Sequence, residues 1–403
     1  MVIFIFIFRI AELLTDYLWF DSLGFKSIFM VSIEAGILLF FVSAAIFFLF
    51  LMFNLWIASK CRENLKNLIK FKTKFWISIL LSFFIGSATS SQWMIVLQYF
   101  RQVSFGLTDP ILSKDVSFYI FSLPFFQAVL GFAFICLIFT VVFVIIDYFQ
   151  SIIISFFKQP QVKNTQGIPQ YSINLKTELS KLKRKAIVHI SVLFSLFFLL
   201  LALKHYLTRF SIMYSEKGIV VGAGYTDVAV FLPIINILIV FAVIIAVFIF
   251  FWMIFSKKTF KKRSFLMYTI IAYFVIVLVG QTAIPGVVQS LKVSPNEINL
   301  ERPYIENNIE FTRIAYGLSD VVEKDFSVDE KISKEIISNS PKTIENIRIL
   351  DWRPLTTTYK QTQEIRLYYD LSGIDIDRYN IEGKDTQVML APRELEQSQI
   401  IEN

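Results

Sequence analysis

The chain has 403 residues, of which 55% are hydrophobic and 16% aromatic, with 44 Phe. This composition and a mean hydropathy of +0.61 exclude an ordinary soluble domain and predict an integral membrane protein. The two cysteines exclude a disulfide framework, and the formal net charge of +7 hides two oppositely charged parts.

The two parts meet near residue 291. Of the 39 Lys or Arg residues, 25 lie in residues 1–291 and 14 in residues 292–403. Of the 32 Asp or Glu residues, 11 lie in the first part and 21 in the second. Because the basic excess belongs to the apolar part, it indicates membrane topology rather than nucleic-acid binding. We expect a polytopic transmembrane domain over residues 1–291 and an extracytoplasmic α+β domain, incomplete, over residues 292–403.

The apolar start of the chain, Met1–Phe8, is soon followed by Arg9 and Glu12. A helix from Val2 to Leu14 would be about 20 Å long, which is too short to cross a membrane unaided. The sequence therefore predicts the end of a first span whose beginning is missing or shortened. The next segment, Thr15–Phe29, is rich in aromatic residues and predicts an interfacial belt.

Six longer apolar segments each have about the length needed to cross a hydrocarbon core roughly 30 Å thick. The predicted spans are Met30–Ile57, Phe75–Leu97, Phe125–Ile146, Ala186–Leu207, Val228–Phe255 and Phe265–Ile284. With the short first helix, they predict a membrane all-α helical bundle of six clear spans plus one short one.

Helix-start signals precede the span Phe125–Ile146. Asp109 followed by Pro110 suits an N-cap with proline at the first helical position, and Ser113 is a second candidate cap. We expect a short amphipathic helix, ended by Pro124, whose apolar side consists of Val116, Tyr119, Ile120 and Leu123. The next helix then starts at the proline and is apolar on all sides.

The basic residues of the loops predict an orientation. Lys or Arg occurs six times in residues 58–74, seven times in 149–185 and five times in 257–263, but twice in each of the alternate loops. Basic loops stay on the cytoplasmic side of a membrane. We therefore expect residues 292–403 outside the membrane, and the N-terminus inside if the first helix crosses.

From Lys292 the hydropathy falls, and the pattern predicts a small α+β domain. Helices are expected over Tyr304–Tyr316, which Gly317 ends, from Ser340–Pro341 onward, and over Leu355–Tyr369. Two strands are expected on either side of a turn at Glu382–Lys384, and they are Ile374–Asp377 and Gln387–Leu390.

The span Phe75–Leu97 contains an unusually small and polar run. Ser87, Ser90 and Gln92 could line a polar pathway together with Gln281 of the last span. Small residues also let helices approach closely and hydroxyls bond across the interface, and this packing interpretation is favoured.

Two pairs of carboxylates are candidates for chemistry. Asp109 and Asp115 could act as an acid and a base or bind a cation, but helix capping already accounts for them. Asp375 and Asp377 form the DxD pattern of some metal-dependent glycosyl transfer sites. The same alternation occurs in any half-buried strand, so the solvent-face interpretation is favoured. No cofactor is expected.

Two histidines and two carboxylates lie in or near the spans. His189 and His205 are about 24 Å apart by helical rise, so one helix alone does not let them share a metal, and interfacial packing is favoured. Glu34 and Asp147 lie within about one turn of predicted span ends. Contact with the interface is favoured over a role in an ion path.

Four segments together resemble the uncharacterised protein family 0182, bacterial multi-span membrane proteins with a large domain outside the membrane. They are Thr15–Phe25, Gly106–Phe125, Asn296–Leu318 and Asn346–Leu395, and spaced identities such as PYI..NI..TR.AYG are specific. The resemblance implies a multi-pass protein of the bacterial plasma membrane, with seven spans and an outer domain longer than the one here. We therefore expect a truncated product or fragment, and the family has no established activity to transfer.

The favoured function is a noncatalytic envelope protein whose outer domain binds another envelope component, a protein or polymer, while the bundle holds it in the lipid bilayer. A transporter or channel using the polar span is the alternative, and a membrane-anchored metal-dependent enzyme is third. The sequence contains no phosphate-binding loop, GxSxG elbow or nucleophilic triad pattern, which counts against an enzyme. Small-residue helix faces would allow oligomers.

Overall fold

The computed structural model describes residues 2–61, 70–158, 184–255, 263–326, 331–349, 351–363 and 368–397. The chain forms two compact units, Met1–Ser319 and Asp320–Asn403. The boundary expected after residue 291 lies within the first unit, because the last apolar helix continues directly into a polar one.

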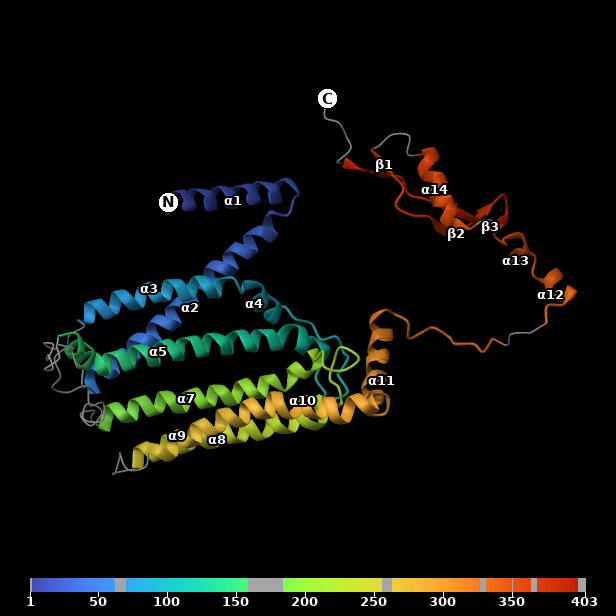
Figure 1. Ribbon diagram of the computed structural model, residues 1–403. Helices are drawn as coiled ribbons and strands as arrows, with labels where there is room; N and C mark the ends of the chain where they lie inside the picture. Colours follow the sequence, from blue (N-terminus) through green and yellow to red (C-terminus); the bar gives the residue numbers. More distant parts are fainter. Residues whose placement is uncertain are drawn as a thin grey trace, which may run out of the picture. The chain divides into compact units, whose positions relative to one another are not determined.

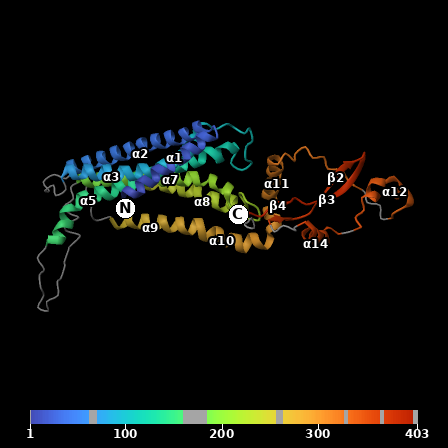
Figure 2. The same cartoon turned by 90° about the horizontal axis from the view of Figure 1, so that it is seen from above.

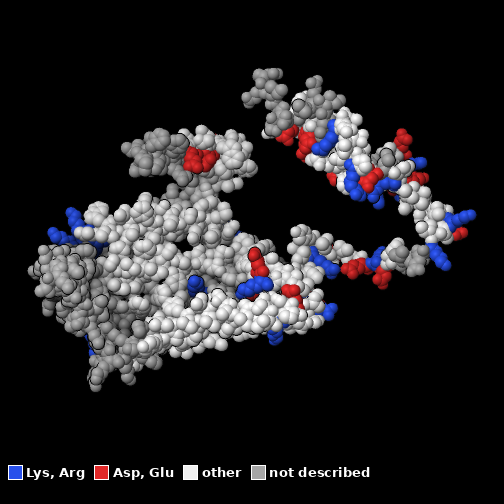
Figure 3. Space-filling model, in the orientation of Figure 1, with Lys and Arg blue, Asp and Glu red and all other residues white. Residues whose placement is uncertain are grey.

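Among the described residues, six helices are long and apolar enough to cross a membrane, in agreement with the expected all-α bundle. They are Lys26–Cys61, Phe71–Ser90, Phe118–Phe149, Arg184–Thr208, Asp227–Trp252 and Tyr268–Ala315. In Figure 3 the middle of the bundle is mostly uncharged at its surface, as a lipid-facing wall requires.

The long helices of the first unit run side by side (Figures 1 and 2). They are α2 (Lys26–Cys61), α3 (Phe71–Ser90), α5 (Leu123–Lys158), α7 (Arg184–Thr208), α8 (Leu232–Phe255) and α9 (Arg263–Leu278). Contacting neighbours are α3 with α2, α2 with α5, α5 with α7, α7 with α8, and α8 with α9. The bundle is therefore a row in which sequence neighbours mostly pack together.

Two clusters of buried side chains hold this row together. The first joins α2, α5 and α7 and includes Phe47, Leu137 and Leu193. The second joins α7, α8 and α9 and includes Phe198 and Tyr273. Since lipid is as apolar as these side chains, close packing rather than exclusion of water stabilises such contacts inside a membrane.

The first helix is longer than expected. α1 covers Val2–Ser22, which is 21 residues instead of the predicted Val2–Leu14. The predicted interfacial segment from Thr15 therefore begins as part of this helix. Leu13, Leu14 and Leu18 continue its helical spacing, and the Thr15 hydroxyl donates to the Ala11 carbonyl at 2.8 Å. α1 is not among the six apolar helices found in the described chain.

Four wide, π-type turns each end two residues before a proline. η1 (Phe118–Ser122), η3 (Asp227–Phe231), η4 (Val279–Ala283) and η5 (Gln289–Val293) precede Pro124, Pro233, Pro285 and Pro295. In each, the residue before the proline donates its N–H to the carbonyl five residues earlier. Proline lacks an N–H and clashes with the carbonyl four residues back, and the wider turn accommodates it. The prediction that Pro124 ends a helix was wrong for this reason.

The predicted span Phe75–Leu97 is divided in two. α3 ends at Ser90, and α4 (Trp93–Phe100) begins after a short turn. The hydroxyls of Thr89, Ser90 and Ser91 all donate to carbonyls three or four residues earlier. Such local bonds compete with backbone helical bonding and favour a break at this position.

The last apolar helix leads through η4, α10 (Ile284–Val288), η5 and η6 (Ser294–Asn296) into α11 (Glu297–Ala315). α11 begins earlier than the predicted Tyr304 but ends as predicted at Gly317, whose φ is +64°. The N–H groups of Gly317 and Leu318 donate to the carbonyls of Ile314 and Arg313 at 3.1 and 2.8 Å. This is a Schellman C-cap. We call the end of the bundle that contains α11 the α11 end.

In the second unit, α12 (Lys334–Asn339) is followed by α13 (Pro341–Glu345), which begins after Ser340 as predicted. α14 covers Trp352–Gln363. The helix predicted to reach Tyr369 therefore ends earlier, and positions 364–367 lie outside the described residues. Tyr369 belongs instead to β1 (Tyr369–Asp370), whose antiparallel pairing with β4 (Glu394–Leu395) competes with helix formation.

The predicted hairpin is confirmed, with longer strands. β2 (Asp375–Ile381) pairs antiparallel with β3 (Lys384–Leu390). The two residues between them, Glu382 and Gly383, have φ values of +52° and +82°. Two positive φ values define the type I′ turn that suits the twist of a two-residue hairpin.

Candidate functional site at the α11 end

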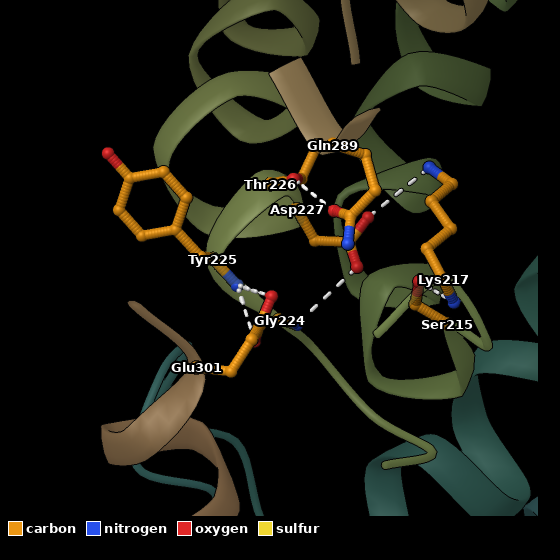
Figure 4. A network of polar contacts seen from close by, with 8 residues as sticks. All are labelled: Ser215, Lys217, Gly224, Tyr225, Thr226, Asp227, Gln289 and Glu301. Carbon is orange, nitrogen blue, oxygen red and sulfur yellow. Dashed lines mark hydrogen bonds and ion pairs between the residues drawn. The ribbon is translucent and has the colours of Figure 1, made fainter. Parts of the chain in front are cut away.

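The α11 end contains a network of polar groups, shown in Figure 4. Its residues come from the loop between α7 and α8 and from the segment that runs from η5 into α11. Two carboxylates, Glu301 and Asp227, are each only 2% exposed. A buried carboxylate is unfavourable without hydrogen bonds or a counter-charge, so its partners show what the network does.

Glu301 on α11 caps the helix that becomes α8. Its two carboxylate oxygens accept the N–H of Tyr225 at 3.2 and 3.0 Å. Tyr225 is the first residue of that helix. A helix N-terminus has unpaired N–H groups and a partial positive charge, and both favour a carboxylate. The cap therefore comes from a residue 76 positions further along the chain.

The carboxylate can approach because residue 224 is glycine. A Cβ at Gly224 would lie 2.9 Å from Oε2 and 3.1 Å from Oε1 of Glu301. Gly218 is less restrictive, since a Cβ there would lie 3.8 Å from the same carboxylate. Any side chain at position 224 would have to displace Glu301 from the helix end.

Asp227 lies in the first turn of the same helix, and a cation balances its charge. Lys217 Nζ is 3.3 Å from Asp227 Oδ1 and 4.4 Å from the centre of the Phe231 ring. The N–H of Gly224 donates to Asp227 Oδ2 at 3.4 Å. The loop is thus folded back so that a lysine and a helix N-terminus both stabilise one buried carboxylate.

Three further hydrogen bonds join this loop to the α11 side of the network. Thr226 Oγ1 donates to Gln289 Oε1, Lys292 Nζ donates to the Tyr225 hydroxyl at 2.7 Å, and Asn308 Nδ2 donates to the Val221 carbonyl at 2.9 Å. Together with Glu301, they connect four positions between residues 289 and 308 to the loop. The start of α11 is therefore fixed to the bundle by side-chain contacts.

Asp109, a sequence candidate, lies at this end in the loop before η1. Its carboxylate is 3% exposed and accepts the N–H groups of residues 111, 112 and 114 at 2.9, 2.6 and 2.8 Å. It also accepts the hydroxyl of Tyr119 at 2.6 Å. These bonds close a turn instead of starting a helix, so the helix predicted from Pro110 was wrong.

Asp115, the second candidate, is the cap of the helix that begins at Val116. It accepts the Ser104 hydroxyl at 2.6 Å and the Ser117 N–H at 2.8 Å. These bonds hold the pKa of Asp115 well below its usual range. Ser113, the cap expected from the sequence, instead has a positive φ of 54° in the preceding turn. In this structure both aspartates organise the loop.

The candidates for a polar pathway have different surroundings. Ser87 and Gln92 are exposed, and Ser90 donates to the Ser87 carbonyl at 2.7 Å within its own helix. Gln281 lies in η4, where its Nε2 is 3.1 Å from Nδ1 of His205 on α7. The other nitrogen of His205 is 2.8 Å from the hydroxyl of Tyr273. Gln281 therefore helps to join α7 to the last helix.

The buried side of α3 consists of Lys74, Ser78, Ser82 and Gly86. A Cβ at Gly86 would lie 2.9 Å from the Cβ of Ala44 and 3.0 Å from the Phe40 carbonyl on α2. Gly86 and the small serines on this side of α3 thus allow a close approach of the two helices.

Asp375 and Asp377 lie in β2 of the second unit, opposite Leu390 and Val388. Both side chains are exposed. Alternate positions of a strand share a face, so the two carboxylates point to the same side of the hairpin. Among the described residues, no group of three or more His, Cys, Asp or Glu side chains gathers where it could hold a metal ion.

A second polar cluster lies at the opposite end of the bundle. Lys74 and Asp147 form an ion pair and are 8% and 2% exposed. Nearby in sequence, the Tyr148 hydroxyl is 2.9 Å from Nδ1 of His189, whose Nε2 is 3.1 Å from Asn54 Oδ1. Asp147 is therefore buried between helices and does not extend to the interface as expected. Glu34 is exposed.

Sequence reasoning missed Glu301, Gly224 and Asp227 as a site. Two signals were present: Gly222-Ala-Gly224 followed by Asp227 just before a span, and Glu301 within the segment Asn296–Leu318. The first pattern indicates a helix start. Neither signal shows that the two segments meet.

The model of the uncharacterised protein family UPF0182 matches residues 1–403. The chain belongs to this family. A UPF0182 protein of Alkaliphilus metalliredigens is 33% identical over 99% of the chain, and one of Trichodesmium erythraeum is 33% identical over 97%. A UPF0182 protein of Moorella thermoacetica is 34% identical over 97%. The chain spans 42% of the length of each of these relatives. No solved structure matches the chain.

Proposed function

We propose that this UPF0182 protein is a noncatalytic anchor of the bacterial cell envelope. Its helical bundle holds an outward-facing binding region at the surface of the plasma membrane. The observation that carries the proposal is the capping of the α8 helix by Glu301 of α11. A flexible tether would not need a buried carboxylate, a glycine that admits it and three further side-chain bonds.

Loop charge supports an outward α11 end. Residues 58–74, 149–185 and 257–263 contain six, seven and five Lys or Arg, whereas the two loops at the α11 end contain two each. Basic residues are retained on the cytoplasmic side, so the α11 end faces outward in this proposal. Loops on rigid scaffolds are also where binding residues concentrate.

A capture experiment tests the anchor function. The chain in lipid nanodiscs is incubated with a solubilised cell-envelope fraction, beside empty nanodiscs and the variants Glu301→Ala and Glu306→Ala. We expect a specific envelope component to be retained by the native chain, to be lost with Glu301→Ala and to be kept with Glu306→Ala. Equal retention by empty nanodiscs, or by Glu301→Ala, would contradict the proposal.

A transporter is the second candidate, and the buried ion pair Lys74–Asp147 favours it, because ionisable residues inside a membrane often mark transport pathways. Alanine replacement of Ser78 and Ser82, which lie on the buried side of α3 together with Lys74, separates the two functions. A pathway would lose flux in proteoliposomes at unchanged expression, whereas a packing face would lose expression first. An envelope anchor shows no solute flux in either case.

A further inference from the structure

A small pocket lies at the α11 end beside the network. Its walls come from three segments that are far apart in the sequence: residues 110–111, the stretch from Met213 to Ala223, and one side of α11 that includes Tyr304, Asn307 and Phe311. The volume of the cavity is about 170 Å³. Neither the capping of α8 nor the loop turns require such a space.

The walls of the pocket are fixed by contacts already described. Asp109 accepts the N–H of Ile111 at 2.9 Å, which holds the first wall. Asn308 Nδ2 donates to the Val221 carbonyl at 2.9 Å, which ties the second wall to α11. Since both walls are held without a ligand, binding would need little rearrangement, and a preformed site loses less affinity to ordering.

The chemistry of the lining selects an uncharged ligand group. The described residues that line the pocket include no Lys, Arg, Asp or Glu, so a phosphate or carboxylate would find no counter-charge there. Most lining side chains are aliphatic or aromatic. Asn307 is half-buried and has no hydrogen-bond partner among the described residues, so its amide can bind both a donor and an acceptor.

The size and the position of the pocket limit what fills it. An apolar cavity of about 150 Å³ is large enough for a benzene ring, so one aromatic ring or branched aliphatic group would fill this one. α11 contains six charged residues among its 19, which places it outside a hydrocarbon core. Lipid chains therefore do not provide the natural occupant, whereas a protein on the same side of the membrane can.

We propose that this pocket binds one aromatic or branched aliphatic side chain from an extended segment of a partner protein, with the Asn307 amide bonded to the segment's backbone. The Asn307 amide has both a hydrogen-bond donor and an acceptor, and so does the backbone peptide group next to any side chain that enters the pocket. The inference rests on the envelope function proposed above, because that function requires a partner on the outer side of the membrane. The pocket is the point at which that partner attaches to the α11 end.

The test uses the full chain in nanodiscs and N-acetyl-L-phenylalaninamide as the probe, with N-acetylglycinamide as its control. Saturation-transfer NMR reports which probe protons contact the protein. We expect transfer to the phenyl ring and none to the glycine control. Val220→Trp, which fills the pocket, should abolish the transfer, and Asn307→Ala should weaken binding about fivefold through loss of one hydrogen bond. Glu306→Ala, outside the pocket, should have no effect.

Unchanged transfer in a folded Val220→Trp variant would overturn the inference, as would an absence of transfer in the native chain. If Val220→Trp does not fold, Asn307→Ala decides, and unchanged affinity overturns the inference. Displacement of the probe by a straight octyl chain, but not by 4-methylpentanamide, would identify an acyl-chain site and would also contradict it. The probe needs no envelope component, so its failure is distinguishable from failure of the capture experiment.

Discussion

Replacement of Glu301 by alanine tests whether α11 is fixed to the membrane bundle through the α8 helix end. The change removes the acceptor of the Tyr225 N–H in a site where the carboxylate is 2% exposed. Loss of a helix cap costs about 0.5–2 kcal/mol, and leaving a buried N–H without a partner costs about 1–3 kcal/mol. We expect a loss of about 2 kcal/mol in the local stability of this contact, since the two effects describe the same bond.

Hydrogen exchange followed by mass spectrometry measures this loss for the chain in nanodiscs. About 2 kcal/mol corresponds to a roughly thirtyfold larger population of the open state, and amides of the loop 218–227 should exchange faster by that factor. Glu301→Gln, which keeps the shape and one acceptor, should fall between the native chain and Glu301→Ala.

Glu306→Ala is the matched control on the same helix. Its side chain is 67% exposed and pairs with Arg302 at 3.4 Å, an exposed pair of the kind that contributes about 0–1 kcal/mol. Exchange in the loop 218–227 should not change in this variant. Native-like exchange in Glu301→Ala, or equal acceleration in both variants, would refute the role assigned to the cap.

Three further predictions follow from the same contacts. Gly224→Ala should lower the thermal stability of the chain in detergent, because the new Cβ would lie 2.9 Å from the Glu301 carboxylate. Gly131→Ala is the control and should leave the thermal stability unchanged, because a Cβ there would have nothing within 4 Å. Equal effects of the two changes would contradict the prediction. Asp147→Asn should destabilise the chain by about 3–5 kcal/mol, because it leaves Lys74 buried without its counter-charge. Denaturant unfolding measures this loss of stability. A loss no larger than that caused by a substitution at an exposed site would contradict the prediction. The folded pKa of Asp115 is lowered, so its loop should stay ordered above the unfolded pKa of about 3.9 and lose order as the pH falls further. The NMR chemical shift of the Ser117 amide, which donates to Asp115, reports this change. The same pH response in Asp115→Asn would disprove the role assigned to Asp115.

Features that depend on nearby residues could be predicted from the sequence. Hydropathy located the apolar helices, because length and composition alone decide whether a segment can span a membrane. Gly317 marked the end of α11, since a left-handed residue at that position favours glycine. Glu382–Gly383 marked the hairpin turn for a similar reason.

Features that depend on contacts between residues far apart in the sequence could not be predicted from the sequence. The sequence around Asp109 fits a helix cap equally well, but the hydroxyl of Tyr119 and three backbone N–H groups fix it in a turn. Pro124 looked like a helix end because the widened turn that accommodates it has no sequence signature of its own. Glu301 and Tyr225 are 76 positions apart, and no local pattern predicts their meeting.

Labelling of a single cysteine at position 306 tests the central claim most directly. Glu306 is an exposed position on α11, and the variant Glu306→Cys is made with Cys61→Ser and Cys136→Ser. A membrane-impermeant maleimide is applied to intact spheroplasts and to inverted membrane vesicles. An outward-facing anchor predicts labelling in spheroplasts and none in inverted vesicles. Labelling only in inverted vesicles would place the α11 end in the cytoplasm and would contradict the proposed envelope function.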